Sequence, residues 1–472
     1  MRSPASWRGV ALLVAGAFFM ENLDGTIIAT AAPRMAASLG VRSVDLNVVI
    51  TAYLLTLAVF IPVSGWIADR VGARTVFTAA IALFTVASGL CALSTSLGEL
   101  TAVRVLQGIG GAMMVPVGRL VVLRSTTRAD LIDAIAYLTW PALAAPVIAP
   151  ALGGVLTTYA SWRWIFVINL PLGIVAIAIA MRIVPNVRVG GHAALDWPGF
   201  ALTGVGLAAL VYGLELCTAG RVEWGLVAAS LAVAVVSLMI AVRHLQRTRF
   251  PLMNLAALKI PTFRVMALGG SFFRLAIGAV PFLLPLMFQD AFGWTSLKSG
   301  LLVVAVFVGN IGIKPVTGPL LRKLGFRRVL LAAGAGAGVT VLLCSLLTAH
   351  TPLAVIVLVL LSSGVFRSIA FTAYNTIAFA DIAAEDVGNA NTLSATMQQL
   401  TMGLGVAVGA LALRAGGPIA RLFGASGTGA SPFAVGFVIV AALAFVAVAD
   451  SALLRPDAGA AIIATSDASI AS

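Results

Sequence analysis

Long apolar runs alternate with short polar stretches along almost the whole chain. Each run holds about 20 residues, the length at which an α-helix crosses a hydrocarbon layer about 30 Å thick. The pattern predicts fourteen membrane-spanning helices, at 9–30, 47–67, 76–97, 100–122, 134–157, 165–184, 197–217, 225–242, 265–288, 300–321, 329–348, 353–373, 395–415 and 433–453. We therefore expect an all-α membrane protein.

Composition supports this class of protein. Of the 472 residues, 60% are hydrophobic and 10% are charged, whereas a soluble domain carries about 25% charged residues. The net charge of +13 does not indicate a nucleic-acid partner, because the basic residues lie in short loops rather than on one domain. Isolated cysteines within apolar runs and histidines near the run ends predict no metal site, disulfide framework or catalytic triad. We expect a protein that is not an enzyme.

The basic residues also predict the orientation. The loops on the same side as the N-terminus, together with both tails, hold most of the Lys and Arg residues, and the positive-inside rule places them in the cytoplasm. The loop after 353–373 is an exception, with Asp381, Glu385 and Asp386, but acidic residues contribute little to this rule. We expect a multi-pass protein of the bacterial inner (plasma) membrane with N- and C-termini in the cytoplasm.

An internal repeat predicts two related halves. GWIADRVGAR (Gly65 to Arg74) and GPLLRKLGFR (Gly318 to Arg327) share Gly at the first and eighth positions and Arg at the tenth. Each copy lies between two spans, as in duplicated transporters that place the substrate path between their halves. The expected organisation is an N-terminal six-helix half at 1–190, two inserted helices at 191–250, a C-terminal six-helix half at 251–455 and a disordered cytoplasmic tail at 456–472.

Six motifs follow one another along the chain: LDGTIIATAAP (Leu23 to Pro33), the GxxxDRxGxR loop, RVLQGIGGA (Arg104 to Ala112), APVIAPALGG (Ala145 to Gly154), SWRWIFVINLPLG (Ser161 to Gly173) and LDWPGF (Leu195 to Phe200). With these motifs the chain resembles, over nearly its whole length, the major facilitator superfamily. The similarity is to its fourteen-helix drug:proton antiporter branch, and the chain looks like the MdtD-like bacterial membrane proteins of that branch. The resemblance implies the major facilitator fold, with two six-helix halves plus two inserted helices.

The loop after the second span combines small residues with charges: Gly65, Asp69, Arg70, Gly72 and Arg74. Gly65 allows close helix contact, and Asp69 can accept backbone N–H groups or pair with an arginine. We interpret the cluster as a breakable latch between helices, which the resemblance also implies; the alternative is a loop that only sets the topology. Ala73 stands where the family usually has a base, and Arg322 replaces the acid in the second copy, so we expect a weaker latch there.

The fifth span concentrates residues that bend helices: Pro141, Pro146, Pro150, Gly153 and Gly154. In lipid, neighbouring helices must satisfy the backbone groups that proline frees, so a bent helix in a tight bundle is one interpretation. The resemblance implies more, because a fifth helix rich in Gly and Pro is associated with antiporters. Ala145 and Ala149 replace the glycines that usually precede the two prolines, which loosens the match.

Three charged residues within spans form a candidate proton-coupling site. Glu21 and Asp24 stand three residues apart and lie on nearly one face of the first predicted helix. Burial and a neighbouring carboxylate both favour the protonated form, so we predict a proton site; a structural pair satisfied by an arginine is the alternative. Arg104 needs an anionic or carbonyl partner, for which Asp24 is the candidate. The resemblance implies that Arg104 couples protonation to conformational change, and a structural bridge between helices is the alternative.

Four further bases lie inside spans. Arg119 and Lys314 are near the cytoplasmic ends of their spans, where we expect them to snorkel. Arg274 and Arg367 are deeper. If these two line a central cavity, its positive potential favours an anionic or zwitterionic substrate over lipophilic cations.

Asn375, Gln398 and Gln399 either line the substrate path with these bases or hold helices together. The chain has no GxxxxGK[ST] loop, so ATP is not expected to be the direct energy source. We predict a proton-coupled exporter of small molecules, of the multidrug type, that works by alternating access as a monomer in the lipid bilayer, with protons as coupling ion and no other cofactor. An exporter of anionic or zwitterionic metabolites, an uncoupled facilitator and a non-transporting receptor or accessory subunit are the alternatives.

Overall fold

The computed structural model describes residues 7–41, 43–127, 130–186, 194–218, 222–424, 429–460 and 462. Within these residues the regular structure is entirely helical. The α-helices are α1 (Trp7–Leu39), α2 (Asn47–Phe60), α3 (Ser64–Val71), α4 (Ala73–Leu93), α5 (Leu97–Ser125), α6 (Leu131–Tyr159), α7 (Trp164–Val167), α8 (Asn169–Ile183), α9 (Trp197–Thr218), α10 (Trp224–Arg247), α11 (Pro261–Ala267), α12 (Gly269–Leu286), α13 (Ser296–Gly312), α14 (Lys314–Leu324), α15 (Phe326–Cys344), α16 (Leu353–Ile377), α17 (Val387–Leu422) and α18 (Ser431–Ala452).

Each of the fourteen predicted spans coincides with one of these helices or with a consecutive pair. Twelve of the described helices are long and apolar enough to cross a membrane, or thirteen when the bent pair α13 and α14 counts as one span. The pair bends by 51° beside Pro315, whose ring removes a backbone donor. The helix α6 adds a further 29 residues at the fifth predicted span. Val86, Ile174 and Leu358 are largely exposed on outer faces, as lipid contact requires.

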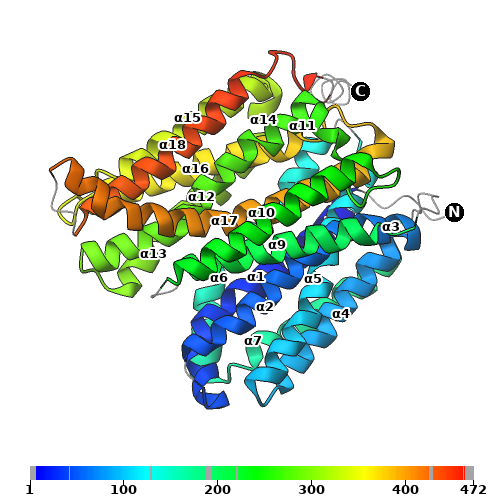
Figure 1. Cartoon of the computed structure of the whole chain (residues 1–472), viewed down its shortest axis with the longest axis horizontal. Helices are drawn as coiled ribbons and strands as arrows, with labels where there is room; N and C mark the ends of the chain where they lie inside the picture. The colour runs from blue at the N-terminus through cyan, green and yellow to red at the C-terminus, as the bar shows by residue number, and fades with distance from the viewer. Residues whose placement is uncertain are drawn as a thin grey trace.

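The long helices form two groups, which meet at the end of the molecule that carries both termini and splay apart away from it (Figure 1). In one group, α1 packs against α5, α6 and α8, while α4 and α2 pack against α5. In the other group, α12 packs against α17 and α18, and α16 packs against α13 and α15. Both copies of the repeat run from the end of one helix into the first turn of the next, from α3 into α4 in one group and from α14 into α15 in the other. We call the end with the termini the terminal end.

The inserted helices α9 and α10 pack against each other, and α9 also contacts α2 of one group and α17 of the other. Asp196 links the start of α9 to the end of α10. Its Oδ1 atom accepts hydrogen bonds from the Gly199 amide at 2.9 Å and pairs with Nε2 of His244 on α10 at 2.7 Å, while its Oδ2 atom accepts from the Leu252 amide at 3.2 Å. Burial raises the pKa of Asp196, but these hydrogen bonds outweigh burial and hold that pKa below its usual value.

Part of the predicted disordered tail, 456–472, packs against the helices. The side chain of Ile462 is fully buried and belongs to the same apolar cluster as Phe326 and Leu454. Gly459, with φ of +77°, turns the chain beside the Phe326 ring. An apolar side chain can dock in this way because the tail is not uniformly polar. Residues 461 and 463–472 lie outside the described part of the chain.

Candidate functional site

A buried ion pair lies inside the N-terminal group of helices. Nη1 of Arg104 on α5 lies 2.5 Å from Oδ2 of Asp24 on α1, and the two side chains are 1% and 0% exposed. The Arg104 guanidinium also lies 4.1 Å from the ring centroid of Tyr53 on α2, which adds a cation–π contact. The pairing of Arg104 with Asp24 is the one that the sequence predicts. A pair so deeply buried is stable only when its remaining polar atoms are also satisfied.

Neutral polar side chains form hydrogen bonds with the polar atoms of this pair. Gln107 accepts a hydrogen bond from Arg104 Nη1 at 2.6 Å and donates to Asp24 Oδ1 at 2.9 Å. Asn169, at the start of α8, donates to the same Asp24 oxygen at 3.0 Å, and both amides also donate to Oγ of Ser88 on α4. Sequence reasoning missed these three residues, because a single amide or hydroxyl in an apolar run carries no spacing signal. The network joins four helices around one carboxylate.

Glu21 lies one turn before Asp24 on α1, yet its side chain has different surroundings. Glu21 lines a cavity between the two groups of helices, whereas Asp24 does not. Its Oε2 atom is buried and has no hydrogen-bond partner among the described residues. Gly111 of α5 lies opposite, and a Cβ atom there would come within 3.5 Å of the Glu21 carboxyl carbon. The spacing correctly brings the two acids near each other, but only one of them faces the cavity.

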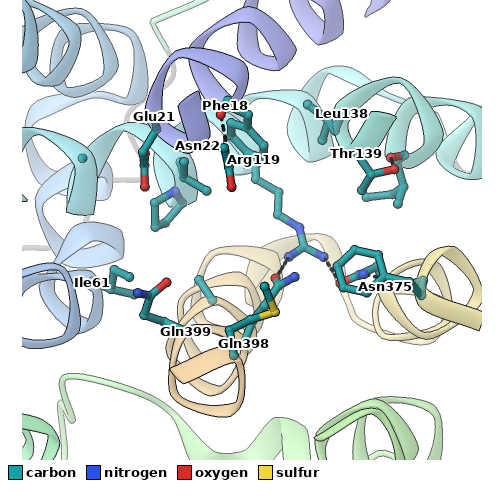
Figure 2. A pocket seen from close by; sticks show the side chains of 17 residues that line it. Phe18, Glu21, Asn22, Ile61, Arg119, Leu138, Thr139, Asn375, Gln398 and Gln399 are labelled. Carbon is teal, nitrogen blue, oxygen red and sulfur yellow. Dashed lines mark hydrogen bonds between the residues drawn. The ribbon is translucent and has the colours of Figure 1, made fainter. Parts of the chain in front are cut away.

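The cavity has a volume of about 200 Å³. Its walls come from α1, α5 and α6 on one side and from α16 and α17 on the other, so it lies between the two groups (Figure 2). Arg119 of α5 points across it, donating from Nη1 to Oε1 of Gln398 at 3.2 Å and from Nη2 to Oδ1 of Asn375 at 3.3 Å. Gln399 lines the same cavity. The cavity is thus lined by one acid, Glu21, by one base, Arg119, and by several amide side chains.

The predicted substrate-path residues divide into two sets. Asn375 and Gln398 line the cavity. Arg274 reaches it only indirectly, because its Nη2 atom donates to Asn375 Oδ1 at 3.4 Å. Arg367 donates to the carbonyl of Ile277 at 3.5 Å and is not among the residues that line the cavity.

The prediction that Arg119 and Lys314 snorkel is wrong. The helix α5 continues to Ser125, so Arg119 is not at a membrane surface, and its side chain is 7% exposed. Lys314 is also buried, and its Nζ atom donates to Oγ1 of Thr139 on α6 at 2.9 Å and to Oγ1 of Thr372 on α16 at 2.8 Å. The position of a base within an apolar run does not reveal which face of the helix it occupies.

The predicted gating loop lies at the terminal end, where it contacts α5 and α17. Asp69 on α3 accepts a hydrogen bond from Nη2 of Arg124 at 2.7 Å. Gly388, in the first turn of α17, lies against this pair, since a Cβ atom there would be 3.1 Å from that nitrogen and 3.4 Å from Asp69 Oδ2. A helix N-terminus favours a carboxylate. Gly65 packs against α17 so closely that a Cβ atom would lie 2.1 Å from Oγ1 of Thr392.

The other residues of this loop shape and anchor it. Gly72 ends α3 with φ of +105°, a conformation that favours glycine, and it lies against the Asn186 side chain. The Arg70 guanidinium lies 5.4 Å from the Trp66 ring centroid. Arg74 lies in the first turn of α4.

The second copy of the loop makes its own contact between the groups. Nη1 of Arg322 on α14 lies 3.3 Å from Oδ1 of Asp133 at the start of α6. Gly318 allows this approach, because a Cβ atom there would be 3.0 Å from the same Asp133 oxygen. The second copy therefore has an ion pair although Arg322 stands in place of the acid, because Asp133 on α6 supplies the carboxylate.

The glycines of the fifth predicted span behave differently from one another. The backbone is helical throughout α6, while the side chains of Pro146 and Pro150 lie outside the described residues. Gly153 packs against α1, where a Cβ atom would lie 2.3 Å from Oγ1 of Thr30. A Cβ atom on Gly154 would meet nothing within 4 Å. Gly153 is thus required for the contact of α6 with α1, and Gly154 is not.

Similarity to known proteins agrees with this architecture. A family model described as Major Facilitator Superfamily matches residues 14–406, with a second match at 266–465. The chain belongs to the Major Facilitator Superfamily. This superfamily member is 37% identical over 410 residues to proteins of Salmonella paratyphi A and Salmonella typhimurium that bear the name "Putative multidrug resistance protein MdtD". Each match covers 87% of this chain and 87% of the relative.

A solved structure shares the fold of this superfamily member. The crystal structure of the human organic anion transporter MFSD10 (TETRAN) matches with a TM-score of 0.65 and 14% sequence identity, over 95% of this chain and 100% of that one. The expected major facilitator fold and the MdtD-like resemblance are therefore confirmed. The protein is a multi-pass membrane transporter. Among the described residues, no group of three or more His, Cys, Asp or Glu side chains could hold a metal ion.

Proposed function

We propose that this transporter is a proton-coupled exporter that works by alternating access in a bacterial inner membrane, with both termini in the cytoplasm. The observation that carries the proposal is the placement of Glu21 in the cavity between the two groups, one helical turn from the buried Asp24–Arg104 pair. Intramembrane carboxylates of this kind are typical of proton pathways. The relatives named for multidrug resistance support export.

Closure of the terminal end supports a state open to the outside. The Arg322–Asp133 pair and the contact of Gly65 with α17 hold the groups together there, and the helices diverge toward the opposite end (Figure 1). In this state substrate leaves and a proton from outside reaches Glu21 through the cavity. The contacts at the terminal end then break, and the groups rock to open the cavity to the cytoplasm.

In this proposal, proton transfer to Asp24 couples protonation to the conformational change. Protonation removes the charge that holds the Arg104 guanidinium and turns one Asp24 oxygen into a donor, which weakens the hydrogen bonds that Arg104, Gln107 and Asn169 donate to this carboxyl group. Because the network joins α1, α4, α5 and α8, its rearrangement shifts the packing within that group. The membrane potential supplies about 2.3 kcal/mol per charge for each 100 mV, more than a tenfold concentration ratio.

The test is proton release in acidified inverted vesicles, challenged separately with panels of lipophilic cations, organic anions and zwitterions. Substrate-triggered release that disappears with Asp24→Asn supports antiport. A substrate flux that neither the mutation nor the proton gradient changes indicates an uncoupled facilitator. Binding without flux indicates a receptor. Alkalinisation that requires Arg104 but never a substrate would indicate a proton leak rather than an exporter.

A further inference from the structure

We infer that the central cavity takes a zwitterionic organic molecule, whose cationic group binds at Glu21 and whose anionic group binds at Arg119. The inference rests on the proposed export function and names the class of its cargo. Its basis is that one cavity is lined by an acid and a base that are not paired with each other (Figure 2).

Arg119 has neutral partners only. Its two hydrogen bonds go to amide oxygens, and the acceptor that it uses on Asn375 is shared with Arg274. Two guanidinium groups therefore converge on a single neutral oxygen. Neither arginine forms an ion pair with any described carboxylate. A buried cation without a counter-ion is unfavourable, and a planar carboxylate, sulfonate or phosphate matches the guanidinium geometry.

Glu21 likewise forms no ion pair with a described base. One of its oxygens is buried without a hydrogen-bond partner among the described residues, and Arg104 is paired with Asp24 instead. A cationic group at this oxygen would take the place of a proton. Competition between the cation and the proton for one carboxylate is what antiport requires, because the two ligands then occupy the carrier in alternation.

The spacing of the two charges sets the length of the ligand. Gly111 of α5 lies opposite the Glu21 carboxyl group, and Arg119 follows eight residues later on the same helix. Eight residues of α-helix span about 12 Å. Because an arginine side chain in a helix projects back toward the helix N-terminus, a ligand with its charges separated by less than about 12 Å can reach both side chains at once, whereas a molecule with one charge leaves either the acid or the base without a partner.

A matched series of ligands tests this directly. We would use ω-aminoalkanoic acids of increasing chain length, their methyl esters, which retain only the cation, and their N-acetyl derivatives, which retain only the anion. Binding to the purified full chain is measured by thermal stabilisation and by equilibrium dissociation constants. We expect an optimum chain length at which the zwitterion binds at least about tenfold more tightly than either derivative, because each lost partner leaves a charged group unsatisfied.

Variants assign the two ends of the ligand. Arg119→Gln should abolish the advantage of the acid over its methyl ester, Arg119→Lys should retain part of it, and Glu21→Gln should abolish the advantage over the N-acetyl form. Arg367→Gln removes a buried base that does not line the cavity and serves as the matched control. Equal binding of zwitterion and methyl ester, indifference to Arg119→Gln, or no stabilisation by any of the three forms would overturn the inference.

A second measurement does not depend on the ligand. A fluorophore attached through Gln399→Cys on the cavity wall reports the local potential by quenching with iodide compared with neutral acrylamide. We expect Arg119→Gln to lower iodide quenching selectively, and an unchanged ratio would contradict the role of Arg119. Proton-coupled export of lipophilic cations that survives Arg119→Gln would overturn the zwitterion while leaving export in place. Loss of proton coupling for every ligand class would instead overturn the proposed function itself.

Discussion

Asp24 and Glu21 lie one turn apart on α1, but Asp24 is enclosed by Arg104, Gln107 and Asn169 while Glu21 faces the cavity between the groups. The two acids therefore have different tasks. Under the proposed function, Glu21 exchanges ligands with the cavity, and Asp24 holds the network that responds. This division follows from their contacts rather than from their spacing, which is the same for any pair of residues three apart on a helix.

The first prediction concerns stability. Asp24→Asn leaves Arg104 buried without a counter-ion and should lower the free energy of unfolding by about 3–5 kcal/mol, whereas Glu21→Gln should change it by less than about 1 kcal/mol. Thermal unfolding of the purified variants measures both. The double variant Asp24→Asn with Arg104→Gln should recover part of the loss in a double-mutant cycle, and additive losses would show that the two side chains are not coupled.

The second prediction concerns the contact of Gly65 with Thr392. Gly65→Ala places a methyl group 2.1 Å from Thr392 Oγ1, so the terminal end should no longer close. Adding Thr392→Gly should restore closure, because it removes the clashing atoms. Distance distributions between spin labels on α3 and α17 report the closed fraction. Gly154→Ala, at a position where a Cβ atom meets nothing, is the control, and a closed terminal end in Gly65→Ala would contradict the packing.

The third prediction concerns the pair formed by Arg322 and Asp133. The side chains are 20% and 40% exposed, so breaking the pair should cost at most about 1 kcal/mol, which shifts the two access states by about fivefold. Arg322→Asp should open the terminal end, and the exchange Arg322→Asp with Asp133→Arg should close it again. The same spin-label measurement applies. An effect of Arg322→Asp that the exchange fails to reverse would show that Arg322 acts through another partner.

The fourth prediction concerns pH. Because the folded state holds the pKa of Asp196 below its usual value, this carboxylate stabilises the fold fully above the unfolded pKa near 4. That contribution is lost as the pH falls through the lower, folded value. Asp196→Asn should therefore lower the melting temperature at pH 7, and the difference from wild type should shrink toward pH 3. A difference that is constant over this range would show that the charge of Asp196 does not contribute.

The sequence predicts the helices well because lipid imposes a length and a polarity on every span. It also predicts the Asp24–Arg104 pair, since a buried arginine must find an anion and few were available. It could not predict Arg119, because an apolar run does not reveal which face of a helix meets the cavity. The Arg322–Asp133 pair was missed for a related reason, since its acid comes from a helix nearly two hundred residues away.

Gradient-driven uptake in proteoliposomes tests proton coupling most directly. The purified chain is reconstituted, a proton gradient is imposed, and accumulation of a transported ligand is compared among wild type, Glu21→Gln and Asp24→Asn. We predict accumulation that a protonophore abolishes in wild type and that both variants lose. Gradient-driven accumulation that is unchanged in both variants would contradict the account.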